Sequence, residues 1–285
     1  MGQGTIPTKT MSHFQAMTAR ESQKTPQDVL SILKAGIPLS QADLYQLDLR
    51  GFDLSAANLN RATLIRADLS QSNLIKSDLS GADLRGADLN KATLQQANLQ
   101  GACLFRVDLS GADLRGANLT DTQLLGARYD SQTLFPPDFA YKSSGAIGPG
   151  ANLNGAPLNT ANLRNADLQN ANLLGAYLGG ADLTGANLCG ARLVQADLRG
   201  AILTGAFLRN ARLNGANLAR VDLRAVDLTD AAFEQFESIA GADFTQVQGL
   251  SEAMRSRLLS QPKIELETMH PLTRKTTLES LSNDP

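Results

Sequence analysis

The chain has few of the side chains from which catalytic and metal-binding sites are built. Its 285 residues include two histidines, two cysteines and no tryptophan. His13 and His270 lie in polar segments near the two ends, so no catalytic triad or metal cluster can be assembled around them. We therefore predict a protein that is not an enzyme and that binds no cofactor or metal. Cys103 and Cys189 are predicted to be two free thiols, because they fall on outward positions of distant repeats.

Two further absences concern location and partners. No run of about 18 apolar residues is present, so we predict that the chain does not cross a membrane. The N-terminal segment MGQGTIPTKTMSHF lacks the apolar core of a signal peptide, which makes the cytoplasm the expected location. Arg192 and Arg212 form a short basic pair, but the arginines around them are dispersed and balanced by aspartates. Direct binding to nucleic acid is therefore not expected.

Leucine, in contrast, recurs at every fifth position over most of the chain. The register runs from Leu44 to Leu124 and Tyr129, then resumes at Leu153 and continues to Phe233. On a helix, a five-residue step turns by about 140°, which would scatter the leucines over every face. On a strand, an odd step would place successive leucines on opposite faces. Only a chain that turns a corner every five residues brings them to one inner surface.

The residues around each leucine fit this interpretation. Alanine usually stands two positions before the leucine, and Asp or Asn usually stands one position before it, as in Ala42-Asp43-Leu44. Asp, Asn and Gly, which are frequent in the remaining positions, are also residues that form turns. The unit A-(D/N)-L-x-x, in runs such as ADLSGADLRGADL and ANLNGAPLNTANLRNADL, resembles the pentapeptide repeat family. The resemblance covers residues 42–233 apart from one interruption.

This resemblance implies an all-β fold, a right-handed quadrilateral parallel β-helix with four repeats in each coil. The number of sides comes from the resemblance and not from the spacing. A single repeat cannot be stable alone, because ordering five backbone residues costs about 5–10 kcal/mol and burying one leucine returns about 1.5–3 kcal/mol. Stability must therefore grow with the number of stacked coils, and the open ends need covers.

Short helices are expected to cover both ends. Thr25 and Pro26 are an N-cap residue and a first helical residue, and Gly36 is well placed to end that helix. Ser251 opens a second helical pattern. The predicted organisation is a disordered tail at 1–24, a capping helix within 25–37, a first repeat block at 42–129, an interrupting loop at 130–150, a second block at 151–244, a capping helix at 250–261 and a disordered tail at 262–285. Whether the two blocks form one continuous rod is left open.

The interrupting loop contains three aromatic residues and three prolines. The distance from Tyr129 to Leu153 is not a multiple of five residues, so the register is lost and restarted. Loops of this length in compact folds are usually functional or mobile. Phe135, Phe139 and Tyr141 are the candidate loop contacts. Similar FP-x-x-F loops occur in pentapeptide repeat proteins of photosynthetic bacteria.

Steps of twenty residues sort the surface of the first block into columns. The residues directly after five of the leucines are mostly large and apolar, where Ser, Asn and Gln are usual. We define these as the apolar column: Tyr45, Ile65, Arg85, Phe105 and Leu125. An exposed apolar stripe favours a partner surface, with Arg66 and Arg106 beside it. The alternative interpretation is that the loop folds back and lays its aromatic residues on this column.

A second column consists of Asp48, Asp68, Asp88 and Asp108, and we define it as the acidic ladder. The resemblance gives this ladder a meaning, because some family members imitate DNA with acidic faces and bind type II topoisomerases such as gyrase. Against that role, residues 39–129 contain ten acids and nine bases. A DNA imitator should be more strongly negative.

The sequence therefore predicts a non-catalytic scaffold that binds another protein through the apolar column and the loop. The alternative function is a DNA-mimicking modulator of type II topoisomerase that acts through the acidic ladder. Self-association is a further use of the apolar C-terminal segment, which would form a homodimer through Phe233, Phe236, Phe244 and Leu250.

Overall fold

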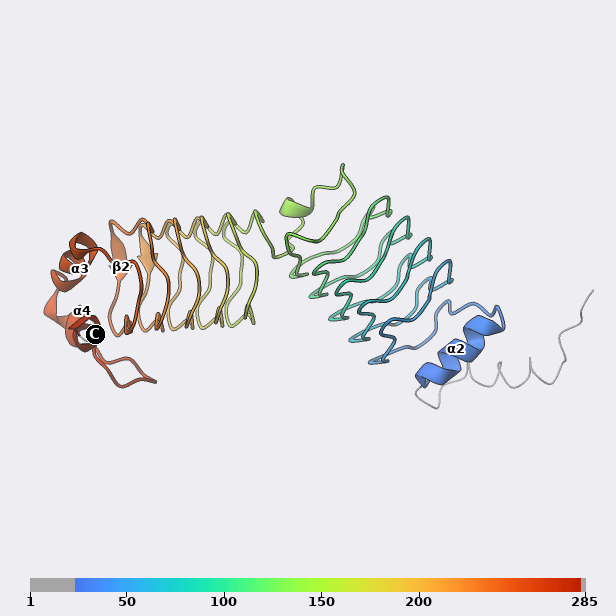
Figure 1. Cartoon of the computed structure of the whole chain (residues 1–285), viewed down its shortest axis with the longest axis horizontal. Coiled ribbons are helices and arrows are strands. Elements are labelled where there is room, and N and C mark those ends of the chain that lie inside the picture. The colour runs from blue at the N-terminus through green and yellow to red at the C-terminus, as the bar shows by residue number, and fades with distance from the viewer. Residues whose placement is uncertain (1–23, 283–285) are drawn as a thin grey trace, which may run out of the picture. The chain divides into compact units, whose positions relative to one another are not determined.

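The computed structural model describes residues 24–282, which form two compact units. Unit 1 comprises residues 24–127 and 132–139, and unit 2 comprises residues 128–131 and 140–282. The predicted tail 1–24, with His13, lies outside the described residues apart from Lys24. The helices and strands are α2 (Pro26–Lys34), η1 (Tyr141–Ser143), β1 (Ala216–Asn217), β2 (Phe236–Ser238), α3 (Glu252–Leu259), α4 (Lys263–Glu267) and α5 (Thr277–Ser282) (Figure 1).

The backbone of unit 1 repeats its hydrogen bonds every twenty residues. Parallel bridges join Asp43 to Thr63, Thr63 to Asp83, and Asp83 to Cys103. The amide of Leu44 donates to the carbonyl of Thr63 at 2.8 Å, and the amide of Thr63 donates to the carbonyl of Ala42 at 2.9 Å. A twenty-residue step with five residues on each side gives coils with four sides. Unit 2 follows the same rule, with bridges from Asn152 to Asn172 and onward.

Each corner of a coil is a tight turn that explains the repeat unit. The amide of Leu47 donates to the carbonyl of Leu44 at 3.3 Å, and Gln46 between them has a φ of 55°. The carboxylate of Asp43 accepts a hydrogen bond from the amide of Tyr45 at 3.1 Å. The same bond recurs at other sides, which is why Asp or Asn stands before the leucine. Gly51 occupies the corner position with a φ of 66°, which costs glycine less than any other residue.

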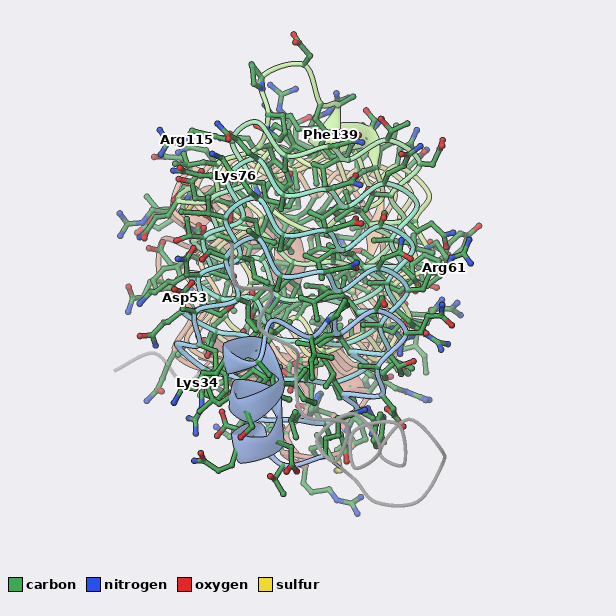
Figure 2. The ribbon with its side chains drawn as sticks, turned by 90° about the vertical axis from the view of Figure 1, so that its right-hand side faces the viewer. Lys34, Asp53, Arg61, Lys76, Arg115 and Phe139 are labelled. Carbon is green, nitrogen blue, oxygen red and sulfur yellow. The ribbon has the colours of Figure 1, made fainter. Side chains whose placement is uncertain are left out.

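Leucine and alanine fill the interior, and charged groups point outward. Leu64, Leu84 and their counterparts in the other coils are almost fully buried, as are the alanines two positions before most of them. Ser72 replaces one alanine, and its hydroxyl donates to the carbonyl of Leu69 at 2.6 Å, so this buried polar group is satisfied. In unit 1, Figure 2 shows Asp53 and Arg115 on one side of the stack and Arg61 on the opposite side. The outward side chains are thus divided among separate sides of the stack, as the five-residue spacing predicts.

Helix α2 lies at the first coil of unit 1 (Figure 1). Its N-terminus is a capping box, in which Thr25 accepts from the amide of Asp28 and the Asp28 carboxylate accepts from the amide of Thr25 at 2.7 Å. Val29 and Ile32 bury the apolar side of the helix. The first coil then begins where the amide of Leu39 donates to the carbonyl of Asn58 at 2.9 Å. The helix falls within the range 25–37 where the sequence predicts one.

The interruption at 130–150 is not a loop throughout, because parts of it join the ladders of the two units. In unit 1, Leu134 forms a bridge with Asp113, a step of 21 residues, and the amide of Leu114 donates to its carbonyl at 2.7 Å. In unit 2, Ile147 forms a bridge with Arg128, a step of 19 residues. The pentapeptide register is lost there, yet the backbone groups of the neighbouring coils still find partners.

The predicted disordered tail at 262–285 is wrong for residues 262–282, which contain α4 and α5. These helices supply side chains that satisfy the edge of the last coil. The Glu265 carboxylate accepts from the amide of Ile239 at 2.7 Å, and the Ser280 hydroxyl accepts from the amide of Phe244 at 3.1 Å. An uncovered edge would leave these amides without partners. His270 is 1% exposed within this cap, so it is a buried residue and not part of a free tail.

Candidate protein-interaction surfaces

The apolar column is a physical column, because backbone hydrogen bonds join its successive coils. The carbonyl of Ile65 accepts from the amide of Gln46 at 2.9 Å, and the carbonyl of Phe105 accepts from the amide of Gly86 at 2.9 Å. The carbonyls of Arg85 and Leu125 accept equivalent bonds at 3.0 and 3.3 Å. Tyr45 is 38% exposed and Leu125 is 62% exposed, whereas Ile65 and Phe105 are half-buried. The structure thus brings together all five residues that the spacing assigned to this column.

One arginine lies within the apolar column and two lie beside it, and the three differ in whether they are already paired. Arg85, within the column, forms an ion pair with Asp83 at 2.6 Å, and its hydrogen bonds lower the pKa of that carboxyl. Among residues 24–282, the side chains of Arg66 and Arg106 have no hydrogen-bond or ion-pair partner. Their stems lie over the corner glycines of the next coil. Two free guanidinium groups therefore flank the apolar side chains, so this surface can bind both apolar groups and carboxylates.

Within unit 1, loop residues 132–139 do not cover Leu125 of the apolar column, contrary to the interpretation in which Phe135 and Phe139 dock there. Leu125 keeps 62% of its surface exposed. The ring of Phe139 lies 6.0 Å from that of Phe135 and lines a shallow hollow beside Leu119, on a different side of unit 1. Because Leu134 continues the ladder, this part of the loop stays at the end of the stack. In unit 2, Tyr141 packs edge-to-face on Tyr129 with ring centroids 5.3 Å apart.

The acidic ladder is also a continuous column, and it is partly neutralised. Parallel bridges join Asp48, Asp68, Asp88 and Asp108 in that order. Arg50 forms ion pairs with Asp48 at 2.7 Å and with Asp68 at 3.3 Å, and it lowers the pKa of Asp48. Burial, together with the charges of Asp108 and Asp68, raises the pKa of Asp88. The stacked carboxylates therefore repel one another in the middle of the ladder, and the field at its first two positions is weakened.

Turn geometry accounts for aspartate at every position of the ladder. The amides of Arg50, Ser70, Asn90 and Ser110 donate to the carboxylates two residues before them at 2.8–3.2 Å. The hydroxyl of Ser110 adds a second bond to Asp108 at 2.6 Å. These bonds hold the corners of the coils whether or not a partner binds.

Other kinds of site have no support in the part of the chain that the structure describes. Residues 24–282 contain no group of three or more His, Cys, Asp or Glu side chains that could hold a metal ion. Over the same residues, no helix has the length and apolar character needed to cross a bilayer. Both cysteines are free thiols.

Sequence reasoning missed several exposed apolar residues. Tyr177 and Phe207 in unit 2 are 53% and 49% exposed, and in the C-terminal cap Ile264 and Leu272 are 75% and 69% exposed. Tyr177 and Phe207 stand directly before an inner leucine, where Asp or Asn is usual. An aromatic residue in place of Asp or Asn at this position is the sequence signal that could have identified them. The cap residues carry no repeat signal, since they lie beyond the last coil.

Parallel four-sided coils of twenty residues define a solenoid repeat protein. The sequence profile described as "Pentapeptide repeats" matches the chain in eight copies, which together span residues 39–128 and 150–230. The chain therefore belongs to the pentapeptide repeat family, which confirms the resemblance seen in its sequence.

Several solved structures are similar to this chain. HetL, a pentapeptide repeat protein involved in heterocyst differentiation regulation in the cyanobacterium Nostoc sp. strain PCC 7120, is 29% identical over 77% of this chain and 97% of its own, with a TM-score of 0.29. The Nostoc protein alr5209 is 32% identical over 46% of this chain and 100% of its own, with a TM-score of 0.28. Full-length QnrB1, a plasmid-mediated fluoroquinolone resistance protein, is 22% identical over 76% of this chain and 99% of its own, with a TM-score of 0.34. No curated protein matches the chain.

Proposed function

We propose that this chain is a non-catalytic scaffold, built as a right-handed quadrilateral β-helix in the cytoplasm, that binds another protein through the apolar column. The observation that carries the proposal is the exposure of Leu125 and Tyr45 at positions where polar residues are usual. The column lies on stacked coils whose backbone hydrogen bonds hold it rigid, so binding requires little ordering of the scaffold. Arg66 and Arg106 beside it add capacity to bind carboxylates of a partner.

Site-specific photo-crosslinking tests this proposal, because it captures a partner whose identity is not specified in advance. A photoreactive amino acid is placed at Leu125 in the full chain, and crosslinked products from the source cells are identified by mass spectrometry. Ser55 follows an inner leucine in the same unit but on another side, which makes it the matched control position. We expect a defined product from position 125 that is absent from position 55. The same products from both positions, or none from position 125, would refute the proposal.

Self-association through the C-terminal end is supported by fewer residues than the sequence predicts. Phe233 and Phe244 are 4% and 3% exposed, so they belong to the interior of unit 2 and cannot form an interface. Ile264 and Leu272 in the cap are exposed, so this end of the chain can still offer apolar side chains to a second copy. Sedimentation velocity at two concentrations tests it, with the double substitution Ile264→Ser and Leu272→Ser as the comparison. A monomer at both concentrations would refute the proposal of self-association.

Modulation of type II topoisomerase through DNA imitation has less support. Arg50 forms ion pairs with two of the four carboxylates of the acidic ladder, and turn geometry explains why aspartate stands at all four positions. The apolar column has no comparable local explanation. A gyrase supercoiling assay decides this alternative, because a DNA imitator would inhibit the reaction or protect it from a poison, and a scaffold of other proteins would do neither.

A further inference from the structure

The ion pairs of the coils follow one positional rule. In the coils within residues 24–282, seven arginines form ion pairs with aspartates at 2.5–3.0 Å. Every one of these arginines stands directly after an inner leucine, and every partner aspartate stands directly before one. The partner is in the same side, as for Arg199 and Asp197, or in the next coil, as for Arg164 and Asp182. Outward side chains that flank the leucines are therefore within ion-pairing reach of one another.

Arg192 and Arg212 reverse this rule. They stand directly before the inner residues Leu193 and Leu213, where aspartate or asparagine is usual. By the same geometry, an acid could reach Arg192 from position 194 or position 174, and could reach Arg212 from position 214 or position 194. Those three positions hold Val194, Leu174 and Asn214, so no carboxylate is present. Within residues 24–282, neither arginine side chain has a hydrogen-bond or ion-pair partner.

The two arginines lie side by side on unit 2. A parallel bridge joins Arg192 to Arg212, which places them in adjacent coils about 4.8 Å apart. Both are exposed, and half-buried Leu174 and Val194 lie in the neighbouring column. Each guanidinium offers a planar fork of donors that matches a carboxylate. The surface therefore combines two adjacent unneutralised forks with an aliphatic strip, a combination that differs from the self-paired arginines on the other sides of this unit.

We propose that Arg192, Arg212 and the adjoining Leu174 and Val194 form a second binding surface, which receives a helical acidic segment of a partner protein. The spacing favours a helix, since the Cβ atoms of residues i and i+4 on a helix lie about 5–6 Å apart, whereas residues i and i+2 of a strand lie about 6.8 Å apart along it. Leucines one turn apart on such a helix contact the aliphatic strip. Nucleic acid fits this surface less well, because six acids and seven bases are interspersed over residues 151–233. This inference is independent of the apolar column in unit 1.

The experiment measures fluorescence anisotropy of a labelled alanine-based helical peptide with Glu at i and i+4 and Leu at i+3 and i+7. The protein variants are Arg192→Gln/Arg212→Gln and the control Arg164→Gln/Arg199→Gln, which removes the same charge from the same unit at arginines that Asp182 and Asp197 already neutralise. We expect the first variant to weaken binding about tenfold and the control about twofold or less. Circular dichroism verifies that both variants fold as the wild type does.

Four outcomes would overturn the proposal. The wild type does not bind the peptide, or a peptide with Gln in place of Glu binds equally well. Both variants lose affinity equally, which would show a general effect of net charge. A labelled single-stranded DNA binds more tightly than the peptide and depends on the same two arginines, which would assign the surface to nucleic acid. Loss of crosslinking at Leu125 leaves this result unaffected, so the two proposals fail separately.

Discussion

A comparison of Leu99→Ala with Leu125→Ala measures whether the five-residue register separates an inside from an outside. Leu99 is fully buried, and its amide donates to the carbonyl of Asn118 in the next coil at 2.9 Å. The leucines of the two adjacent coils, at positions 79 and 119, are also buried, so the cavity left by truncation has little room to collapse. Truncation of a leucine in such a core costs about 3–5 kcal/mol. Leu125 is 62% exposed, so its truncation should change the free energy of unfolding by about 0.5 kcal/mol or less.

The assay is urea denaturation followed by circular dichroism. With a slope of about 2 kcal/mol per M, Leu99→Ala should lower the midpoint by about 1.5 M or more, and Leu125→Ala should leave it nearly unchanged. Repeat arrays can unfold in more than one step, so the comparison is made on the first transition to shift. Equal effects of the two substitutions, or a loss below about 1 kcal/mol for Leu99→Ala, would refute the assignment of inner and outer positions.

Three further predictions concern corners, pH and the C-terminal cap. Gly249→Ala should lower the melting temperature far more than Gly51→Ala, because its Cβ would collide with the backbone nitrogen of Thr229 in the preceding coil, whereas the Cβ at position 51 meets nothing within 4 Å. Equal melting temperatures of the two variants would refute this explanation. Burial by itself raises the pKa of Asp243, but its hydrogen bonds, chiefly from Thr245, lower the pKa by more than burial raises it. The pKa of Asp243 therefore lies below the ordinary value of 3.8. Its contribution to stability is therefore present above the unfolded-state pKa and lost as pH falls through the folded-state pKa. Asp243→Asn should make the melting temperature depend less on pH in this acid range. An unchanged dependence on pH would contradict the role given to Asp243. Glu265→Ala should destabilise the cap by about 1–3 kcal/mol and speed amide exchange in the last coil, whereas Glu267→Ala, at an exposed pair with Lys263, should do neither.

The repeat part of the fold could be predicted because each side of a coil is a local unit. The apolar column and the acidic ladder were both found by counting in steps of twenty, and bridges such as Asp68 to Asp88 confirm the step. The four sides came from the family resemblance, since a five-residue spacing is equally compatible with other numbers of corners. Whether an outward side chain is already paired could be determined only from the structure. Arg85 stands directly after an inner leucine and pairs with Asp83, whereas Arg106 stands one position further on and none of the described residues pairs with it.

The parts that could not be predicted depend on contacts between distant segments. Leu134 and Ile147 join the ladders at steps of 21 and 19 residues, and no local pattern marks them. Helices α4 and α5 are short, and α4 buries only Leu266. Such helices are not stable alone, and their formation depends on docking against the last coil through Glu265 and Ser280. Composition therefore suggested a free tail where tertiary contacts produce a cap.

The number of sides in each coil is the claim on which every column depends, and a thiol-bridging experiment tests it most directly. Native Cys103 forms a parallel bridge with Asp83, so an Asp83→Cys variant in a Cys189→Ser background should be joined to Cys103 by dibromobimane. The thiol introduced by Asp88→Cys lies fifteen residues from Cys103 and would face it only in a coil with three corners. We expect bridging for the Asp83→Cys variant and not for the Asp88→Cys variant, and the opposite result would contradict the four-sided coil.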